Sequence, residues 1–311
     1  MTIALVTGGA GFIGSHLATA LLERGYEVRV IDNFSTGKRE NIAPILDKIT
    51  LYEASITDID ALRIAMENVE YVFHQAAIPS VPRSVTDPET SHEINVNGTF
   101  RLLLAARDAG VKRVVYAASS SAYGDIVGEY KHEALAPRPL SPYGAAKLMG
   151  EYYMQVFYTT YGLETVSLRY FNVFGPRQDP TSEYSAVIPK FITAIQQGKR
   201  PVIYGDGLQS RDFTYIDNVV HGNMLAATTP DPVGQVMNVA CGEQYSLLDL
   251  IDILNRYMGT DAEPEFAPPR KGDIKHSRAD ISKAGALMGY EPLVDFEDGL
   301  ARTIEWFTKQ S

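Results

Sequence analysis

Apolar runs and amphipathic stretches alternate along the first half of the chain. Residues 3–7 form a short apolar run rich in β-branched side chains, and residues 26–31 form a second one. Apolar positions recur at helical spacing between these runs, which predicts a strand-helix-strand unit. The same alternation predicts further strands at residues 49–54, 71–74, 114–118 and 165–170, and helices at residues 58–66, 88–109 and 142–161. We therefore expect an α/β fold, with a doubly wound parallel sheet covered by helices on both faces.

The pattern changes after Asn172, where prolines become more frequent and the apolar runs become shorter. Helices are predicted there at residues 184–197, 217–227, 247–258 and 295–309, and three prolines predict a loop at residues 262–275. We predict a main domain of residues 1–172 and a smaller α/β lobe of residues 173–311. Some segments of the lobe are expected to return to the main domain.

Composition and charge exclude several classes of protein. Hydrophobic residues make up 45% of the chain and charged residues 21%, as in folded globular proteins. The net charge of −10 disfavours nucleic acids and anionic membranes as partners. Cys241 is the single cysteine, so no intrachain disulfide is expected. The chain shows neither a signal peptide nor an apolar run of about 18 residues, and we expect it to be cytoplasmic.

The first predicted turn carries glycines at a characteristic spacing. Gly8, Gly11 and Gly14 follow the first strand and open the first helix, so the backbone can turn tightly and a pyrophosphate can approach the helix N-terminus. Asp32 ends the second strand, where its carboxylate can bind a ribose diol and would repel a 2′-phosphate. The segment therefore predicts a dinucleotide site that takes NAD and not NADP.

Three side chains are candidates for proton transfer. Tyr143 and Lys147 follow a helix-start signal, Ser141-Pro142, and one helical turn separates them. A nearby ammonium favours ionisation of a phenol, and the charge of an oxidised nicotinamide would favour it further. Ser119 ends the fifth predicted strand, at the sheet edge where ligands of open α/β sheets bind. We therefore predict that Tyr143 is the base.

Taken together, these motifs resemble a known family. Residues 7–14, 119–124 and 143–147 look like the Rossmann-fold, extended short-chain dehydrogenase/reductases, and residues 169–176, 211–217 and 270–273 resemble their NAD-dependent UDP-hexose 4-epimerases. The resemblance implies that Tyr143 takes the proton of the sugar O4 hydroxyl while C4 passes a hydride to NAD. The 4-keto sugar then turns over and receives the hydride on its other face. Lys147 would bind the nicotinamide ribose, Ser119 would orient O4, and no metal is implied.

The resemblance also implies which residues contact the cofactor. Many relatives carry an Asp-Ile pair near the adenine where this chain has Ser55-Ile56, so one carboxylate acceptor is missing. The implied cofactor contacts are Gly8, Gly11, Phe12, Ile13, Gly14, Asp32, Asn33, Ser35, Thr36, Gly37, Ser55, Ile56, Gln75, Ala76, Ala77, Asn95, Tyr143, Lys147, Tyr170 and Val173.

A second set of residues is implied to bind the substrate. Arg211 and Arg270 match diphosphate-binding arginines, and Ser277 stands where epimerases restricted to plain hexoses carry a bulky tyrosine. A serine leaves room for an N-acetyl group, so UDP-GlcNAc and UDP-GalNAc are expected substrates, together with UDP-Glc and UDP-Gal. The implied contacts are Ser80, Arg83, Ser119, Ser120, Tyr143, Asn172, Val187, Ile188, Tyr204, Arg211, Arg270, Asp273 and Ser277.

Several alternatives stay open. Arg83 could pair with a C6 carboxylate, as a UDP-glucuronate or UDP-GlcNAcA 4-epimerase requires. A nucleotide-sugar dehydratase or decarboxylase is disfavoured because Ser120 and Ser121, not acidic residues, follow Ser119. A silent NAD-binding protein is the third alternative. Family resemblance further implies a homodimer in which the helices at 88–109 and 142–161 form a four-helix bundle.

Overall fold

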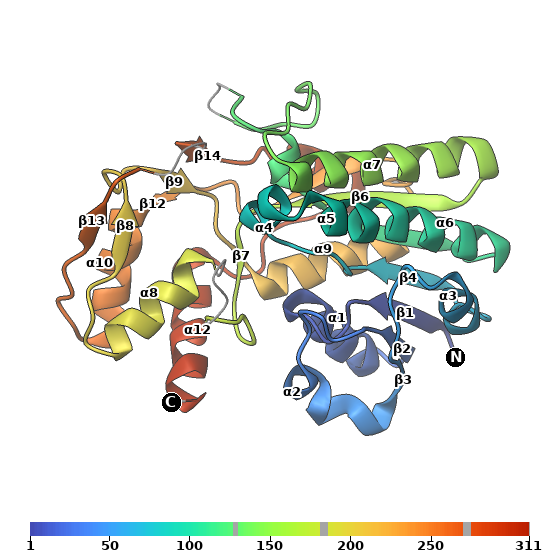
Figure 1. Cartoon of the computed structure of the whole chain (residues 1–311), viewed down its shortest axis with the longest axis horizontal. Helices are drawn as coiled ribbons and strands as arrows, with labels where there is room; N and C mark the ends of the chain where they lie inside the picture. The colour runs from blue at the N-terminus through green and yellow to red at the C-terminus, as the bar shows by residue number, and fades with distance from the viewer. Residues whose placement is uncertain (127–129, 181–185, 270–274, 311) are drawn as a thin grey trace.

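The computed structural model describes residues 1–126, 130–180, 186–269 and 275–310. Its centre is a seven-stranded sheet (Figure 1) in which every neighbouring pair of strands is parallel. The strands, in spatial order, are β11 (Val236–Val239), β6 (Glu164–Tyr170), β5 (Arg113–Ser119), β4 (Tyr71–His74), β1 (Ile3–Thr7), β2 (Glu27–Ile31) and β3 (Ile49–Tyr52). The order reverses between β1 and β4, as in a doubly wound sheet, so the predicted fold class is confirmed.

Strand residues alternate between two hydrophobic layers. Ala4 and Val6 face one layer, whereas Leu5 between them faces the other. The first layer holds α1 (Phe12–Glu23) and α9 (Ile216–Thr228), and the second holds α3 (Ile59–Ala65), α6 (Thr99–Asp108) and α7 (Pro142–Tyr161). Figure 1 shows α6 and α7 running together on one side of the sheet. Burial on both faces explains why the strands are continuous apolar runs.

Side-chain caps fix where the predicted helices begin. The hydroxyl of Ser141 accepts a hydrogen bond from the Gly144 N–H, and Pro142 occupies the first helical position of α7. Asp58 caps α3 in the same way through the Asp60 and Ala61 N–H groups. Gly162 ends α7 in the left-handed conformation, with φ of 72°. The sequence therefore locates α7 correctly at both ends.

The prediction of one continuous helix at residues 88–109 is wrong. The segment contains α5 (Pro88–His92), a π-helical stretch (Glu93–Gly98) and then α6. The Asn95 side chain, 2% exposed, bonds both the N–H and the carbonyl of Ile78. A short helix that the sequence reading missed, α4 (Val81–Thr86), precedes this segment and is capped by Ser80. Hydrophobic periodicity does not distinguish a π-helical insertion from a regular helix.

Most of the remaining helices and strands form a smaller lobe, at the left of Figure 1. Two-stranded pairs join β7 (Val173–Phe174) with β10 (Thr214–Tyr215) and β8 (Val202–Tyr204) with β13 (Glu265–Ala267). β9 (Ser210–Arg211) lies between β12 (Tyr245–Ser246) and β14 (His276–Ser277). The helices of the lobe are α8 (Val187–Gln196), α10 (Leu247–Met258) and α12 (Phe296–Gln310), whereas α11 (Ser282–Met288) packs against β11 and the short α2 (Arg39–Ile42) follows β2 in the main domain.

Three predictions for the lobe need correction. The predicted loop at 262–275 contains the strand β13, because Glu265–Ala267 pairs in parallel with β8. The helix predicted from residue 184 begins at Val187, and residues 184 and 185 lie outside the described part of the chain. The edge strand β11 and helix α11 were not predicted. The division into domains at Asn172 stays a prediction, although β11 pairs with β6 in the main sheet.

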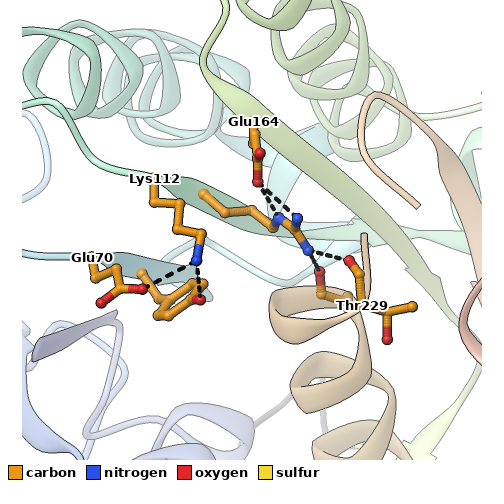
Figure 2. A network of polar contacts seen from close by, with 7 residues as sticks. Glu70, Lys112, Glu164 and Thr229 are labelled. Carbon is orange, nitrogen blue, oxygen red and sulfur yellow. Dashed lines mark hydrogen bonds and ion pairs between the residues drawn. The ribbon is translucent and has the colours of Figure 1, made fainter. Parts of the chain in front are cut away.

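A cluster of charges closes the amino-terminal edge of the sheet (Figure 2). The Arg113 side chain, on β5, donates to Glu164 and to the carbonyls of Ala226 and Thr229 at the end of α9. Lys112 donates to Glu70 and to the Tyr71 hydroxyl. Cations suit the carbonyl end of a helix, so this network anchors α9 to β5 and β6. No helix among the described residues has the length and hydropathy that would let it cross a membrane.

Candidate active site

A cavity of about 640 Å³ lies at the carboxyl-terminal edge of the sheet. The predicted cofactor contacts all line it except Asn95 and Val173. Asn95 supports its wall through the two bonds to Ile78, a lining residue. The cavity therefore brings together motifs that are far apart in the sequence. Their individual roles stay predictions.

The glycine turn forms one wall and has no room for side chains. Gly8 has φ of +66°, and a Cβ added there would lie 2.8 Å from the backbone of Ala76. A Cβ added at Gly14 would overlap the Gly8 carbonyl oxygen. Phe12 and Ile13, in the first turn of α1, also line the cavity, and N–H groups in a first turn have no intrahelical acceptor. These donors and the bare backbone fit a pyrophosphate.

Asp32 stands beside this turn and is 8% exposed. Its Oδ2 accepts from the Ala10 N–H at 2.9 Å and its Oδ1 from the Phe34 N–H at 2.8 Å. Burial raises the pKa of Asp32, and these two backbone hydrogen bonds lower it. Gly37 packs so closely that an added Cβ would lie 2.8 Å from Oδ2. The position suits a ribose diol and leaves a 2′-phosphate next to a carboxylate.

The candidate proton-transfer groups meet at the opposite end of the cavity. The Ser119 side chain lies close enough to Tyr143 to lower the pKa of its phenol, and the Ser121 hydroxyl donates to Ser119 Oγ at 2.8 Å. Lys147 is 3% exposed, and its Nζ donates to the Ala117 carbonyl at 2.7 Å. Tyr143 and Lys147 line the cavity, whereas Ser119 and Ser120 are not among its lining residues. Tyr143 and Lys147 therefore share one cavity, and the Ser119 side chain lies beside Tyr143.

Burial dominates the electrostatics of this trio. It raises the pKa of Tyr143, although the neighbouring Ser119 side chain lowers it. Burial also lowers the pKa of Lys147 to about 7, while the Glu151 carboxylate raises it. The expected lowering of the Tyr143 pKa by Lys147 is not among the causes of the phenol's shift. The protein's own groups therefore favour the neutral phenol.

A buried ion pair beside Lys147 was missed by the sequence reading. Glu151, one helical turn after Lys147, accepts two hydrogen bonds from Arg169 of β6, at 2.9 and 2.7 Å. The Arg169 guanidinium lies 4.4 Å from the centre of the Tyr123 ring, and its Nη1 has no hydrogen-bond partner among the described residues. The i, i+4 spacing of Lys147 and Glu151 was the available signal.

The predicted substrate contacts are spread over several parts of the fold. Ser80 and Arg83, at α4, line the same cavity as Tyr143. Arg211 and Ser277 face each other as register partners of β9 and β14, and the Asn172 side chain donates to the Asp212 carbonyl beside them. Elsewhere, Val187 begins α8, Ile188 is 1% exposed within the core, and Tyr204 is 37% exposed on β8. Arg270 and Asp273 lie outside the described residues.

Asp212 is a second feature that the sequence reading missed. Its carboxylate is fully buried and accepts hydrogen bonds from the N–H groups of Cys241, Gly242 and Ala279. Burial raises the pKa of Asp212 to about 7, against the effect of these hydrogen bonds. Its partners lie 29 to 67 positions later in the chain, so no local pattern announces them. Within the described ranges, no group of three or more His, Cys, Asp or Glu side chains could hold a metal.

Comparisons with known proteins agree with this geometry. The sequence pattern of the NAD dependent epimerase/dehydratase family matches residues 4–240. The chain belongs to this family. The predicted family and the predicted cofactor, NAD, are therefore confirmed, and UDP-sugar 4-epimerase chemistry is supported at the level of the family.

Individual relatives of this epimerase/dehydratase match over nearly their whole length. The chain is 40% identical over 311 residues to a UDP-glucose 4-epimerase of Mycolicibacterium smegmatis, covering 99% of both chains. A crystal structure of UDP-glucose 4-epimerase with UDP-glucose from Thermotoga maritima has a TM-score of 0.95 at 40% identity, with 99% of each chain covered. A UDP-N-acetylglucosamine 4-epimerase from Methanobrevibacter ruminantium, in complex with UDP-N-acetylmuramic acid, has a TM-score of 0.95 at 41% identity, covering 100% of this chain and 99% of that one. Less similar relatives include a UDP-glucuronate 4-epimerase and a sugar-nucleotide decarboxylase.

The acidic residues of the cavity help to distinguish an epimerase from a dehydratase within the family. Among its described lining residues, the acids are Asp32 and Asp179, and Asp179 forms an ion pair with Lys38 at 3.2 Å. Neither is the neighbour of Ser119 that an elimination would need for removal of a C5 proton. Serines 120 and 121 follow Ser119 in the fold as in the sequence.

Proposed function

We propose that this enzyme interconverts UDP-hexoses at C4, acting on UDP-GlcNAc and UDP-GalNAc and also on UDP-Glc and UDP-Gal. The observation that carries the proposal is that Tyr143, whose pKa the neighbouring Ser119 lowers, and Lys147 line the same cavity as the glycine turn and Asp32. A phenol placed there can exchange a proton with a sugar hydroxyl at the mouth of a dinucleotide site.

Each residue of the site has a separate role in the proposed reaction. NAD bound in this cavity would supply the hydride acceptor and donor for C4, and its positive charge would favour a phenolate nearby. Tyr143 takes the proton of the O4 hydroxyl and later gives it back. Ser119 holds O4 through its hydroxyl, which Ser121 already orients at 2.8 Å. Lys147, inside the cavity wall, binds the nicotinamide ribose. The intermediate is a 4-keto sugar that must turn over between the two hydride transfers.

The substrate range is proposed from the lobe. Ser277 is a small residue directly beside Arg211 in the β9–β14 pair. If Arg211 holds the diphosphate, the sugar lies within reach of residue 277, and a serine leaves room for a C2 acetamido group. The chain's similarity to a UDP-N-acetylglucosamine 4-epimerase supports this reading.

A second candidate is a 4-epimerase of UDP-glucuronate or UDP-GlcNAcA. Arg83 projects from α4 into the cavity that Tyr143 lines, so it offers a cation to a C6 carboxylate. The chain is also 35% identical to a UDP-glucuronate 4-epimerase.

One experiment separates these candidates. Purified enzyme is incubated separately with UDP-Glc, UDP-GlcNAc and UDP-GlcNAcA, and products are identified by NMR. The proposal expects C4 epimers of UDP-GlcNAc and UDP-Glc. Turnover of the uronic acid alone would support the second candidate. A loss of C6 oxygen or of carbon dioxide would identify a dehydratase or decarboxylase. No product and no NADH absorbance would identify a silent NAD-binding protein.

Ser277, which we call the gate because it is proposed to admit the acetamido group, gives a sharper test. Replacing Ser277 with tyrosine fills the space proposed for the acetamido group, so kcat/KM for UDP-GlcNAc should fall at least about tenfold while that for UDP-Glc changes little. Ser277→Ala is the matched control and should leave both values near those of the wild type. Equal losses for both sugars in Ser277→Tyr would contradict the gate.

We also propose that the enzyme is a homodimer. α6 and α7 expose large apolar side chains, among them Phe100, Tyr152 and Val156. Exposed apolar groups on two adjacent helices suit pairing with the same helices of a second copy as a four-helix bundle. The cytoplasmic location expected from the single cysteine stays a prediction.

A further inference from the structure

Asp212 lies where the lobe meets the carboxyl-terminal edge of the main sheet. Its carboxylate is 0% exposed. Oδ1 accepts from the Cys241 N–H at 3.0 Å, and Oδ2 accepts from Gly242 at 3.0 Å and from Ala279 at 3.1 Å. Burying a carboxylate is costly unless several donors satisfy it, and backbone N–H groups from two separate segments do so here.

The main chain of the same residue reaches the proposed substrate contacts. The Asp212 N–H donates to the Ser277 carbonyl at 2.8 Å, and the Asp212 carbonyl accepts from the Asn172 side chain at 3.0 Å. Arg211 precedes Asp212 and pairs with Ser277. Asp212 is thus hydrogen-bonded to Ser277 and Asn172 and is adjacent to Arg211 in the chain.

The partners of the carboxylate belong to different parts of the molecule. Cys241 and Gly242 closely follow β11, the edge strand that pairs with β6 of the main sheet. Ala279 follows β14, which lies with β9 and β12 in the lobe (Figure 1). The carboxylate therefore joins the loop after the edge strand of the main sheet to the β9–β14 pair, where we place the UDP diphosphate.

The groups around Asp212 offer no obvious substitute for the hydrogen bonds that its carboxylate accepts. Cys241 and Gly242 use their N–H groups on Asp212, and the Gly242 carbonyl accepts from Arg278 at 2.7 Å. The positive φ of Gly242, 74°, disfavours most side chains there. Changing the residue at position 212 is therefore the direct way to break the link.

We propose that Asp212 is a positioning residue for the UDP half of the substrate. By joining the loop after β11 to β14, it holds Arg211, Ser277 and Asn172 at a fixed separation, so the affinity for UDP depends on a carboxylate that does not touch the ligand. This inference rests on the proposed function in one respect, the placement of UDP beside Arg211.

The variant Asp212→Asn tests the proposal. The asparagine side chain has the same shape as the aspartate, but its NH2 group replaces one carboxylate oxygen and faces backbone N–H donors that it cannot accept from. The Kd of UDP alone, measured by calorimetry, should rise by at least about tenfold, while the Kd of NAD stays within about twofold. With UDP-glucose, KM should rise far more than kcat falls. A merely structural role would weaken NAD and UDP binding alike, or neither, and either result overturns the proposal.

The matched control is Arg113→Lys, which alters another buried charge at the opposite edge of the sheet. It should lower the unfolding midpoint without changing the Kd of UDP. A rise in the Kd of UDP as large as in Asp212→Asn would overturn the proposal, because general destabilisation would then explain both.

Hydrogen exchange on the wild-type protein keeps the test valid if Asp212→Asn does not fold. Binding of UDP should slow exchange of the Cys241, Gly242 and Ala279 amides, because the ligand and the carboxylate hold the same strands. Unchanged exchange at these amides on saturation with UDP would overturn the proposal. If the wild type binds UDP with these effects but epimerises no sugar, the proposed function fails and the role of Asp212 stands.

Discussion

At the scale of single residues, Tyr143 is the group on which turnover depends. Tyr143→Phe removes the hydroxyl that contacts Ser119 and leaves the glycine turn and Asp32 intact. We expect kcat to fall by a factor of roughly 10² to 10⁴. Bound NAD, released by heat and quantified by its absorbance, should stay at the wild-type level. Retention of more than a tenth of the wild-type kcat would show that another group is the base.

The buried positive charge of Lys147 should lower the free energy of unfolding of the NAD-free protein. Burial lowers its pKa from the usual 10.5 to about 7, so the folded chain releases a proton that the unfolded chain keeps between these two pH values. Stability therefore rises with pH across this window, and the full penalty is present below pH 7. Lys147→Met should raise the thermal midpoint at pH 6 by about 5 °C, with a gain that shrinks toward pH 10.

Thermal scans of NAD-free protein from pH 6 to pH 10 check this. Lys48→Met, at an exposed position, is the control and should show no pH-dependent gain. A gain from Lys147→Met that is the same at every pH would mean that packing, not the buried charge, is responsible.

Sequence reasoning reached the residues whose neighbours in the chain announce them. Tyr143 and Lys147 are one turn apart, and Gly8, Gly11 and Gly14 share one turn. Asp212 and the Arg169–Glu151 pair escaped because each depends on partners brought close only by folding. The sequence reading also treated Lys147 as the main influence on the Tyr143 pKa, whereas burial, which only the folded structure reveals, dominates it.

At the scale of elements, the contact between α4 and α7 orients the active site. The buried Ser84 hydroxyl, on α4, accepts from the Tyr143 N–H at 3.1 Å and donates to the Val81 carbonyl at 2.7 Å. Ser84→Ala leaves a first-turn N–H of α7 without its acceptor. We expect a loss of about 1 kcal/mol in unfolding free energy. We also expect a several-fold fall in kcat, with NAD affinity unchanged.

Chemical denaturation and steady-state kinetics measure these effects. Thr86→Ala is a matched control on the same helix, because its exposed hydroxyl bonds only carbonyls of α4. It should change neither value appreciably. An unchanged kcat in Ser84→Ala would show that α7 orients Tyr143 without help from α4.

Uninterrupted apolar strands and long capped helices were predictable, whereas interrupted strands and short helices were not. The strands β1, β4 and β5 are apolar runs buried on both faces, and α7 has a capping serine followed by proline. β11 has four residues, one of them Asn238, and α4 has six, so neither gives a periodic signal. Asn238 is buried because its side chain donates to the carbonyls of Lys131 and Asp280, which no local pattern reveals.

At the scale of the whole molecule, the exposed faces of α6 and α7 predict assembly. Light scattering coupled to size exclusion at micromolar concentration should give twice the chain mass of 34.2 kDa. Val156→Glu puts a charge on α7 at a position that is 48% exposed, and should yield monomers. Ile64→Glu, on α3 and 61% exposed, should stay dimeric. A wild-type monomer would refute the assembly.

The late position of β11 in the chain has a consequence for biosynthesis. Residues 171–235 separate β6 from β11, the strand that covers its outer edge. A ribosome therefore releases six strands of the sheet well before the seventh exists. During that interval the backbone of Glu164–Tyr170 offers unpaired N–H and carbonyl groups, a template for joining another nascent chain. Synthesis of this enzyme thus passes through a stage that is open to aggregation, and emergence of Val239 closes it.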